Sequence, residues 1–252
     1  MTSVSIQDYV ARQERVAWRR RFIRWLTRTV GYSLLVKIHE VGLENIPPSG
    51  PAVIMMNHLS LLDPVICIGS IQSRLVIPMT KVENARSPVL GLLVWMYDAY
   101  TVDRDAVDRS ALLNSIELLK SGQLILIAPE GTRHPEGLAE PKDGVAYVAA
   151  KANAVVVPTA LTGSQDFKER WKRLRRAEVW VTFGRPFRFK TLEGRLTREQ
   201  RAAMMREAMY QLALTQPDPS LRGVYRDVEN ATTEWLEFVD PRNGPPNAQP
   251  SF

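Results

Sequence analysis

The stretch PAVIMMNHLSLLDPVICIGSI, residues 51–71, decides the fold class of this chain. It begins with the apolar run Ala52 to Met56, which is typical of a buried strand. Pro64 then stands where the first turn of a helix tolerates a residue without a backbone N–H, so PVICIGSIQ is expected to be a helix with Asp63 as its N-cap. A strand that leads through a short polar turn into a helix is the basic unit of an α/β fold.

The same order of strands and helices continues to about residue 184. The expected strands are RLVIPM, AYTV, QLILIAP, AVVVPTAL and EVWVTFG, and the expected helices are SPVLGLLVWMY, DRSALLNSIELLKSG and DGVAYVAAKAN. We therefore expect an α/β fold with a central mixed, largely parallel sheet that is flanked by helices. Two closing helices are expected in LTREQRAAMMREAMYQLAL and DVENATTEWLEFV.

Length and composition fit a globular protein of this class. The 252 residues are 45% hydrophobic and 24% charged, which is enough apolar material for a packed core. The single cysteine, Cys67, excludes an internal disulfide framework and is expected to be buried. We expect three regions: a basic amphipathic helix in residues 1–37, an α/β domain in residues 38–214, and a C-terminal helix with a loose tail in residues 215–252.

The N-terminal segment RQERVAWRRRFIRWLTRTVGYSLL lacks proline and is expected to be a helix. Residues 1–37 hold eight basic and two acidic side chains, which accounts for the whole net charge of +6. At about 100° per residue, aromatic side chains gather on one side of this helix and arginines on another. That pattern is typical of a helix in the interface of an anionic membrane, although an aromatic face packed on the domain would also produce it. The residues expected at the membrane are Trp18, Arg20, Arg21, Phe22, Arg24, Trp25 and Arg28.

Several classes of protein are disfavoured by the sequence. No run approaches the roughly 18–20 apolar residues that a membrane-spanning helix needs. Arginines interrupt each apolar run near the N-terminus, so a secretory signal and export are not expected. Residues 38–252 balance at 25 basic and 25 acidic side chains, so the basic charge is not spread over the domain as in a nucleic-acid groove.

The heptapeptide NHLSLLD, residues 57–63, pairs His58 with Asp63. On one helix the two side chains would point about 140° apart, so they can meet only where the chain turns between a strand and a helix. There the carboxylate can hold the imidazole in one tautomer and stabilise the imidazolium, as a general base requires. A polar turn followed by a helix cap would explain the same residues without chemistry, and the heptapeptide alone leaves both interpretations open.

Cations and a glycine follow three other expected strands. APEGTR ends one strand with Gly131 and Arg133, Lys81 ends a second, and Arg104 follows a third. The carboxyl ends of strands in an open α/β sheet form the edge where ligands bind. Glycine permits close backbone approach there, and arginine can hold a phosphate in a fork. Three cations at one edge indicate an anion site, although each alone would be an ordinary solvated loop charge.

The chain offers no protein nucleophile in a familiar setting. It has no Gly-x-Ser-x-Gly elbow, and Ser60 is too close to His58 in sequence to align with it, so a turn role is expected. A general base without such a nucleophile must act on a hydroxyl or water, which means direct transfer. No metal site is expected, because His39 and His134 are the only other histidines and their spacing differs from common zinc patterns.

Four blocks of sequence together resemble the glycerolipid acyltransferase family, of the 1-acylglycerol-3-phosphate acyltransferase type. NHLSLLD matches its His-x4-Asp signature, and APEGTR matches its Phe-Pro-Glu-Gly-Thr-Arg block. YTVDR resembles its second block, and VVVPTAL, which contains Pro158, resembles its fourth. The blocks occur in the family's order and cover about residues 40–185.

The resemblance implies acyl transfer to the free hydroxyl of a lysophospholipid, with 1-acylglycerol-3-phosphate as the default acceptor and phosphatidic acid as the product. Acyl-CoA or acyl carrier protein would be the donor and co-substrate, and no bound cofactor is implied. His58 would be the general base and Asp63 would orient it. The residues implied to bind the acceptor's phosphate are Lys81, Arg104, Glu130, Gly131, Thr132 and Arg133.

The chain departs from the family pattern at Ala128, where phenylalanine is usual, and at Ala99 and Thr101, where glycine and a bulky apolar residue are usual. These differences concern acceptor choice. An enzyme of this type is expected on the cytoplasmic side of the membrane, peripheral or monotopic, in contact with anionic lipids and with no nucleic acid. The alternatives are a non-catalytic lipid-binding protein of the same fold and, less favoured, a nucleic-acid binder. Hydrolysis of the donor is a conceivable side activity.

Overall fold

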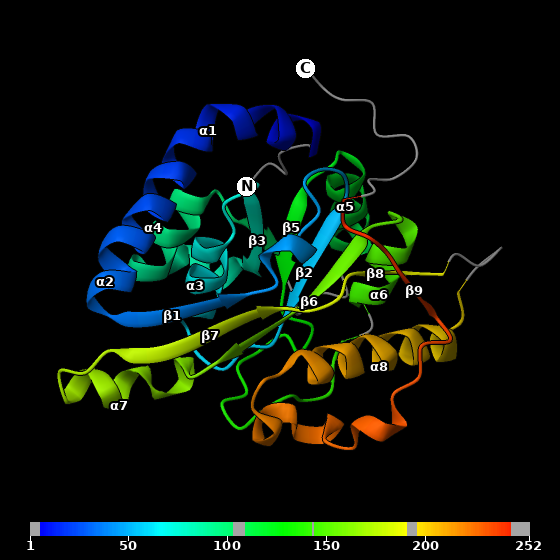
Figure 1. Cartoon of the computed structure of the whole chain (residues 1–252). Coiled ribbons are helices and arrows are strands. Elements are labelled where there is room, and N and C mark those ends of the chain that lie inside the picture. The colour runs from blue at the N-terminus through cyan, green and yellow to red at the C-terminus, as the bar shows by residue number, and fades with distance from the viewer. Residues whose placement is uncertain (1–5, 103–108, 143, 191–195, 243–252) are drawn as a thin grey trace.

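The computed structural model describes residues 6–102, 109–142, 144–190 and 196–242. Within these residues the centre of the molecule is one sheet of nine strands, in the order β1-β7-β6-β2-β5-β3-β4, with β8 beside β6 and β9 beside β8 (Figure 1). The strands are β1 Val36–Val41, β2 Ala52–Met56, β3 Val76–Lys81, β4 Tyr100–Val102, β5 Leu124–Ile127, β6 Val155–Thr162, β7 Ala177–Phe183, β8 Phe187–Phe189 and β9 Leu236–Phe238.

Most neighbouring strands in this sheet are parallel. Strand β2 runs parallel to both β5 and β6, and β3 runs parallel to β5 and β4. Strand β7 is antiparallel to β6, and β8 and β9 add two further antiparallel pairs. The expectation of a mixed, largely parallel sheet is confirmed. The carboxyl ends of β2, β3 and β5 consequently lie together at one edge of the sheet.

Helices cover both faces of the sheet (Figure 1). Helices α5, α6 and α8 bury one face, while α3 and α4 lie on the other and α1 packs across them. The helices are α1 Ile6–Leu26, α2 Tyr32–Leu34, α3 Asp63–Ser70, α4 Pro88–Tyr97, α5 Arg109–Lys120, α6 Gly144–Lys151, α7 Phe167–Lys172 and α8 Arg198–Thr215, and a π-helical turn, Thr27–Gly31, joins α1 to α2. Shorter 3-10 turns are Leu43–Asn45, Val82–Arg86, Ser164–Asp166, Pro219–Tyr225 and Val228–Asn230.

The central strand β2 shows why the sequence folds in layers. Val53 and Met55 join the core under α5, α6 and α8, while Ala52, Ile54 and Met56 join the core under α3. All five side chains are buried because both faces of a parallel strand are covered, and this is why the strand reads as a continuous apolar run.

The C-terminal part differs from the sequence-based expectation. Arg198–Thr215 is the expected helix, but the helix expected in residues 227–239 is wrong, because that segment forms a 3-10 turn followed by the strand β9. The buried Glu207 of α8 accepts hydrogen bonds from the backbone N–H groups of Glu234 and Trp235, at 2.9 and 2.8 Å. These bonds hold the segment extended so that it can pair with β8.

Arginines of helix α1 and of the π-helical turn after it bond to the domain. Arg20 donates to the carbonyl of Tyr97 at 2.6 Å, Arg24 to that of Ile71 at 2.9 Å, and Arg28 to that of Gly69 at 3.0 Å and to Glu40 at 2.7 Å. The first three acceptors lie at the carboxyl ends of α4 and α3, where helices leave carbonyl groups without intrahelical partners and favour cations.

Arg20 is 3% exposed, so the expectation that it faces lipid headgroups is wrong. Arg24 and Arg28 are partly exposed while they bond to the domain, and their contact with a membrane stays a prediction. Trp18, Phe22, Trp25 and Arg21 are exposed, and their expected contact with a membrane stays a prediction. Among the described helices, none combines the length and apolar character needed to cross a membrane.

Candidate active site

The turn that follows β2 is fixed from its first residue. Asn57 is fully buried, and its side-chain amide both donates to the carbonyl and accepts from the N–H of Leu161 in β6, at 2.9 and 2.7 Å. These two bonds attach the end of β2 to its neighbour and direct the chain out of the sheet at His58. Sequence reasoning assigned no role to Asn57, and its position beside the histidine was the available signal.

Asp63 folds this turn back on itself. It is fully buried as the first residue of α3, and its Oδ2 accepts the backbone N–H groups of Leu59 and Ser60, each at 2.6 Å. The same oxygen lies 3.1 Å from Nδ1 of His58. The expected N-cap role is wrong, because the carboxylate serves the preceding turn rather than the helix. Ser60 has the expected turn role, since its hydroxyl accepts the N–H of Leu62 at 3.1 Å.

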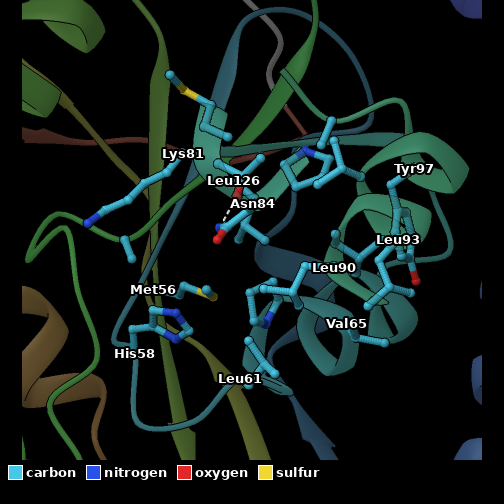
Figure 2. Close-up of a pocket in the computed structure, with 18 of the residues that line it drawn as sticks. Met56, His58, Leu61, Val65, Lys81, Asn84, Leu90, Leu93, Tyr97 and Leu126 are labelled. Carbon is cyan, nitrogen blue, oxygen red and sulfur yellow. Dashed lines mark hydrogen bonds between the residues drawn. The ribbon is translucent and has the colours of Figure 1, made fainter. Parts of the chain in front are cut away.

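The geometry selects one protonation pattern for the histidine. A carboxylate only accepts hydrogen bonds, so the neutral ring of His58 carries its proton on Nδ1 and leaves the lone pair of Nε2 available. The ring is 18% exposed and turns toward the side chains of α3 and α4 (Figure 2). The arrangement can accept a proton at Nε2 and stabilise the resulting imidazolium.

Glu130 supports the same turn and does not line the cavity. Its two carboxylate oxygens accept the N–H of His58 at 3.2 Å and the N–H of Ala139 at 3.0 Å. The N–H of His134 in turn donates to the carbonyl of His58 at 2.7 Å. The expectation that Glu130 binds phosphate needs correction, because its carboxylate is used to join two loops and would repel an anion.

Burial also changes the protonation of Glu130. The side chain is almost wholly buried, and burial raises the pKa of Glu130 to about 7 against the opposing effect of the two backbone hydrogen bonds. The negative Asp63 nearby adds to the increase in the pKa of Glu130.

A cavity of about 260 Å³ opens beside His58 (Figure 2). One side is apolar and is built mainly from helices α3 and α4, which contribute Val65, Ile68, Leu90, Leu93 and Tyr97. The other side is polar, and there Thr80 accepts a hydrogen bond from Asn84 at 2.7 Å. His58 lies where the two sides meet, so an apolar chain and a polar head could both reach it.

Cations and a glycine lie at the polar mouth as expected. Lys81 ends β3, and Gly131, Thr132 and Arg133 follow β5. The side chains of Lys81 and Arg133 are exposed, and neither forms an ion pair with another described residue. Gly131 has φ +77°, a conformation that favours glycine and turns the loop toward the cavity. Arg104 lies outside the described residues.

Comparison with known proteins shows the family of this chain. A family model described as Acyltransferase matches residues 37–162, half of the chain, including both His58 and Asp63. The chain belongs to the acyltransferase family. The 1-acyl-sn-glycerol-3-phosphate acyltransferase of Bacillus subtilis (strain 168) is 30% identical over 169 residues, which cover 67% of this chain and 82% of that protein.

Other relatives support the same relationship. This acyltransferase is 29% identical to 1-acyl-sn-glycerol-3-phosphate acyltransferase alpha of Bos taurus over 168 residues, which are 64% of this chain and 58% of the bovine protein. It therefore spans little more than half of the mammalian relatives. The crystal structure of the 1-acyl-sn-glycerophosphate (LPA) acyltransferase, PlsC, from Thermotoga maritima has the same fold, with a TM-score of 0.59, 22% identity, and 89% and 84% of the two chains covered.

Two positions where this acyltransferase departs from the family pattern lie in the cavity wall. Ala128 and Ala99 both line the cavity, so both departures affect the space beside His58. Sequence reasoning did not find the apolar lining from α4. The sequence feature that could have indicated this lining is SPVLGLLVWMY, which is apolar on every side of the helix. In the structure, α4 presents Leu93 to the cavity, while Leu92 and Trp95 are exposed.

Metal-ligating side chains do not gather near the turn in the part of the chain that the structure describes. His39 lies on β1, where it stacks on Trp180 and bonds to Glu178 at 2.7 Å. His134 contributes its backbone N–H to the turn of His58.

Proposed function

We propose that this acyltransferase moves a fatty acyl chain from acyl-CoA, or from acyl carrier protein, to the free hydroxyl of a lysophospholipid. The preferred acceptor is 1-acylglycerol-3-phosphate and the product is phosphatidic acid. The observation that carries the proposal is the position of His58 between a cationic mouth and an apolar cavity. The relatives from Bacillus subtilis and Bos taurus are named as 1-acyl-sn-glycerol-3-phosphate acyltransferases, which supports the choice of acceptor.

In the proposed reaction, His58 acts as a general base and Asp63 orients its ring. Nε2 of His58 removes the proton of the acceptor hydroxyl as that oxygen attacks the thioester carbonyl of the donor. The tetrahedral intermediate collapses, the C–S bond breaks, and the departing thiolate takes the proton from the imidazolium. No acyl-enzyme forms, because the acceptor hydroxyl is itself the nucleophile.

The two sides of the cavity suggest how the substrates bind. Lys81 and Arg133 supply unpaired positive charge for the acceptor's phosphate, with the backbone at Gly131 close by. The apolar side chains of α3 and α4 can hold an acyl chain out of water. In the proposal, the acceptor hydroxyl and the thioester carbonyl then meet beside the ring of His58.

Exposed aromatic side chains support membrane residence, which we include in the proposal. Trp18, Phe22 and Trp25 of α1 and Leu92 and Trp95 of α4 are exposed, although α1 and α4 pack together. Large apolar side chains gathered in this way mark an interaction surface, and tryptophan is favoured at the membrane interface. We propose peripheral or monotopic binding at the cytoplasmic side, with the substrates drawn from the bilayer surface.

The test measures free thiol released from acyl-CoA by purified protein in the presence of 1-acylglycerol-3-phosphate. Cys67 adds little background, because it is fully buried and burial raises the pKa of its thiol. His58→Ala should abolish turnover while circular dichroism remains unchanged, because no other group at this position can accept the proton. His39→Ala is the matched control and should retain turnover, since His39 lies on β1 outside the cavity.

The alternatives give different results in the same assay. Turnover by His58→Ala at the rate of the native protein would overturn the general-base role. Thiol release without acceptor would indicate hydrolysis, and vesicle binding without thiol release for any acceptor or donor would indicate a non-catalytic lipid-binding protein. Glycerol-3-phosphate and a lysolipid without phosphate, assayed beside 1-acylglycerol-3-phosphate, test whether the enzyme requires a phosphate on the acceptor.

A further inference from the structure

A second charged surface lies outside the candidate active site. It consists of residues 167–176, FKERWKRLRR, which form helix α7 and the turn into β7 and are called the α7 surface below. This segment carries six cations and one carboxylate, and every side chain from residue 168 to residue 176 is exposed. None of its residues lines the cavity, so the proposed chemistry does not account for it.

Most of this positive charge is unpaired. Lys172 forms an ion pair with Glu169 at 2.7 Å, and Arg176 donates to the carbonyls of Tyr32 and Val36. Lys168, Arg170, Arg173 and Arg175 form no ion pair among the described residues. Crowded like charges repel one another and lower stability, so the fold itself gains nothing from them.

Large apolar side chains lie among these cations. Leu174 is 89% exposed, and its φ of +52° is a conformation that leucine rarely adopts. Trp171 is 49% exposed and stacks on Phe167, which is packed on the core. An exposed leucine at the tip of an arginine-rich turn has no packing role in the monomer, so it points to something outside the chain.

The α7 surface adjoins the end of the N-terminal helical segment. Arg176 bonds to the carbonyl of Tyr32 at 2.7 Å, and the N–H of Ala177 bonds to the carbonyl of Leu35 at 3.2 Å. Leu34 between them is 64% exposed. Helices α2 and α7 accordingly lie at the same end of the molecule, beside the first residues of β1 and β7 (Figure 1).

We propose that the α7 surface docks on an anionic lipid bilayer, with Leu174 and Trp171 entering the interface and the arginines contacting headgroup phosphates. Four unpaired cations complement such a surface, and the apolar tip suits the bilayer rather than water. The inference rests on the proposed activity, whose substrate and product are themselves anionic lipids. Docking at the α7 surface together with the exposed aromatic residues of α1 gives two separate contacts with the bilayer, which restricts how the molecule is oriented.

An acidic protein is the competing partner, because it would also attract the arginines. A carrier protein that delivers an acyl chain would have to dock near the mouth of the cavity, whereas the α7 surface contributes nothing to the cavity lining. The α7 surface adjoins the exposed Leu34. Apolar side chains exposed side by side in this way favour a flat apolar partner, such as a bilayer, over the groove of a protein.

The first experiment uses a fluorescent label at residue 174. Cys67 is buried, so Leu174→Cys provides one accessible thiol for an environment-sensitive dye in the full-length protein. Vesicles of equal parts phosphatidylcholine and phosphatidylglycerol should shift its emission to the blue and raise its intensity. A label at Asn230→Cys, an exposed position in the 3-10 turn Val228–Asn230, should remain unchanged. A label at 174 that responds to acyl carrier protein and not to vesicles would overturn the proposal.

The second experiment removes charge in matched pairs. Arg173→Gln with Arg175→Gln should weaken partition to these vesicles by about five-fold for each cation removed, and added salt should reduce the difference. Lys120→Gln with Lys151→Gln removes the same charge from exposed positions on α5 and α6, at the other end of the molecule, and should change partition little (Figure 1). Equal losses in both pairs would show that net charge acts without a defined surface, against the proposal.

Leu174→Asn separates the apolar contribution from folding, because asparagine tolerates the left-handed backbone at this position. It should weaken partition while the melting temperature and thiol release with micellar 1-acylglycerol-3-phosphate stay unchanged. If the native protein releases no thiol but the label at 174 responds to vesicles, the proposed activity fails and the α7 surface stands. If thiol is released and the label does not respond, the α7 inference alone fails.

Discussion

The cavity is bordered by two networks of buried charged side chains, one around His58 and one around Arg20. In the first, Asp63 and Glu130 accept backbone N–H groups of the turn that carries His58. In the second, Arg20 donates to the carbonyls of Tyr97, which lines the cavity, and of Asp98. Both networks hold a segment that faces the cavity.

The two networks differ in what they leave available. Around His58 the carboxylates bind the backbone and Nδ1, so Nε2 can still act on a substrate. Around Arg20 the polar side chains bond to one another rather than to a group that reacts. Gln13 and Arg12 donate to the two carboxylate oxygens of Asp98, at 3.0 and 2.9 Å. Buried charged side chains can therefore orient a residue that reacts, such as His58, or hold a helix such as α1 on the domain. Damage to the first network should appear in turnover, and damage to the second in stability.

Asp63→Asn should have the largest effect. Its amide oxygen can still accept the backbone N–H groups of Leu59 and Ser60 and the Nδ1–H of His58, but it carries no negative charge to stabilise the imidazolium that forms when Nε2 takes the proton. By analogy with other His–Asp pairs, we expect kcat in the thiol-release assay to fall about 10³- to 10⁴-fold. The shape of the side chain is preserved, so the circular dichroism spectrum should not change.

Asp98→Asn is the matched control from the other network. It removes an equally central carboxylate and should lower the melting temperature while kcat at a permissive temperature changes by less than about three-fold, since Asp98 does not line the cavity. A comparable loss of kcat in both variants would mean that the two networks do not have separate roles.

The sequence predicts the first network better than the second because its chemistry is local. His58 and Asp63 are five residues apart, and Pro64 fixes where the helix begins, so one heptapeptide contains most of the turn. The apolar patterns of the strands are predictable because they too depend on local sequence. The same holds for the end of α5 at Lys120, which Gly122, with φ +82°, follows closely. Glu130 was assigned to the right edge of the sheet but to the wrong role, since its partner Ala139 belongs to a loop without periodicity.

The second network depends on contacts that are distant in sequence. Periodicity shows which residues of α1 share a face, and it does not show which face is covered. Arg20 bonds to a carbonyl 77 residues away and Arg24 to one 47 residues away, both at helix ends that the sequence cannot place beside α1. Sequence reasoning misses strand β8 and the extended segment before β9 for the same reason. Their extended conformation depends on pairing between β8 and β9, which are distant in sequence.

Arg20→Met and Arg21→Met test the second network with neighbouring residues. Arg20 is 3% exposed and bonded to the domain, whereas Arg21 is exposed. Removing Arg20 takes the buried donor from the carbonyl of Tyr97, one of two donors from the carbonyl of Asp98, and a cation from beside the Asp98 carboxylate. The free energy of unfolding should therefore fall by about 3 kcal/mol in urea titrations. Arg21→Met should change it by less than about 0.5 kcal/mol.

Vesicle binding gives a second test of Arg20→Met and Arg21→Met. At a temperature where both are folded, Arg21→Met should weaken partition to anionic vesicles about five-fold, and Arg20→Met should leave it unchanged. Reversed effects in the two assays would mean that α1 presents its arginines to lipid as the sequence alone suggests.

Glu130→Gln should have the smallest effect, and the effect depends on pH. The pKa of Glu130 is raised by burial from 4.5 in the unfolded chain to about 7 in the folded protein. The folded chain therefore binds the proton more tightly, so stability is fully present below about pH 4.5 and falls as the pH rises through about 7. We expect the native protein to lose about 2 kcal/mol between pH 5 and pH 8 beyond any loss in Glu130→Gln, measured by urea unfolding.

The comparison with Glu130→Gln cancels the contributions of all other titratable groups, because both proteins contain them. Glu136→Gln, an exposed change in the same loop, is the control and should follow the native curve. If the native protein and Glu130→Gln fell in parallel, the carboxylate would already be ionised at pH 5, and its two backbone hydrogen bonds would outweigh burial. The network around His58 would then hold two full negative charges.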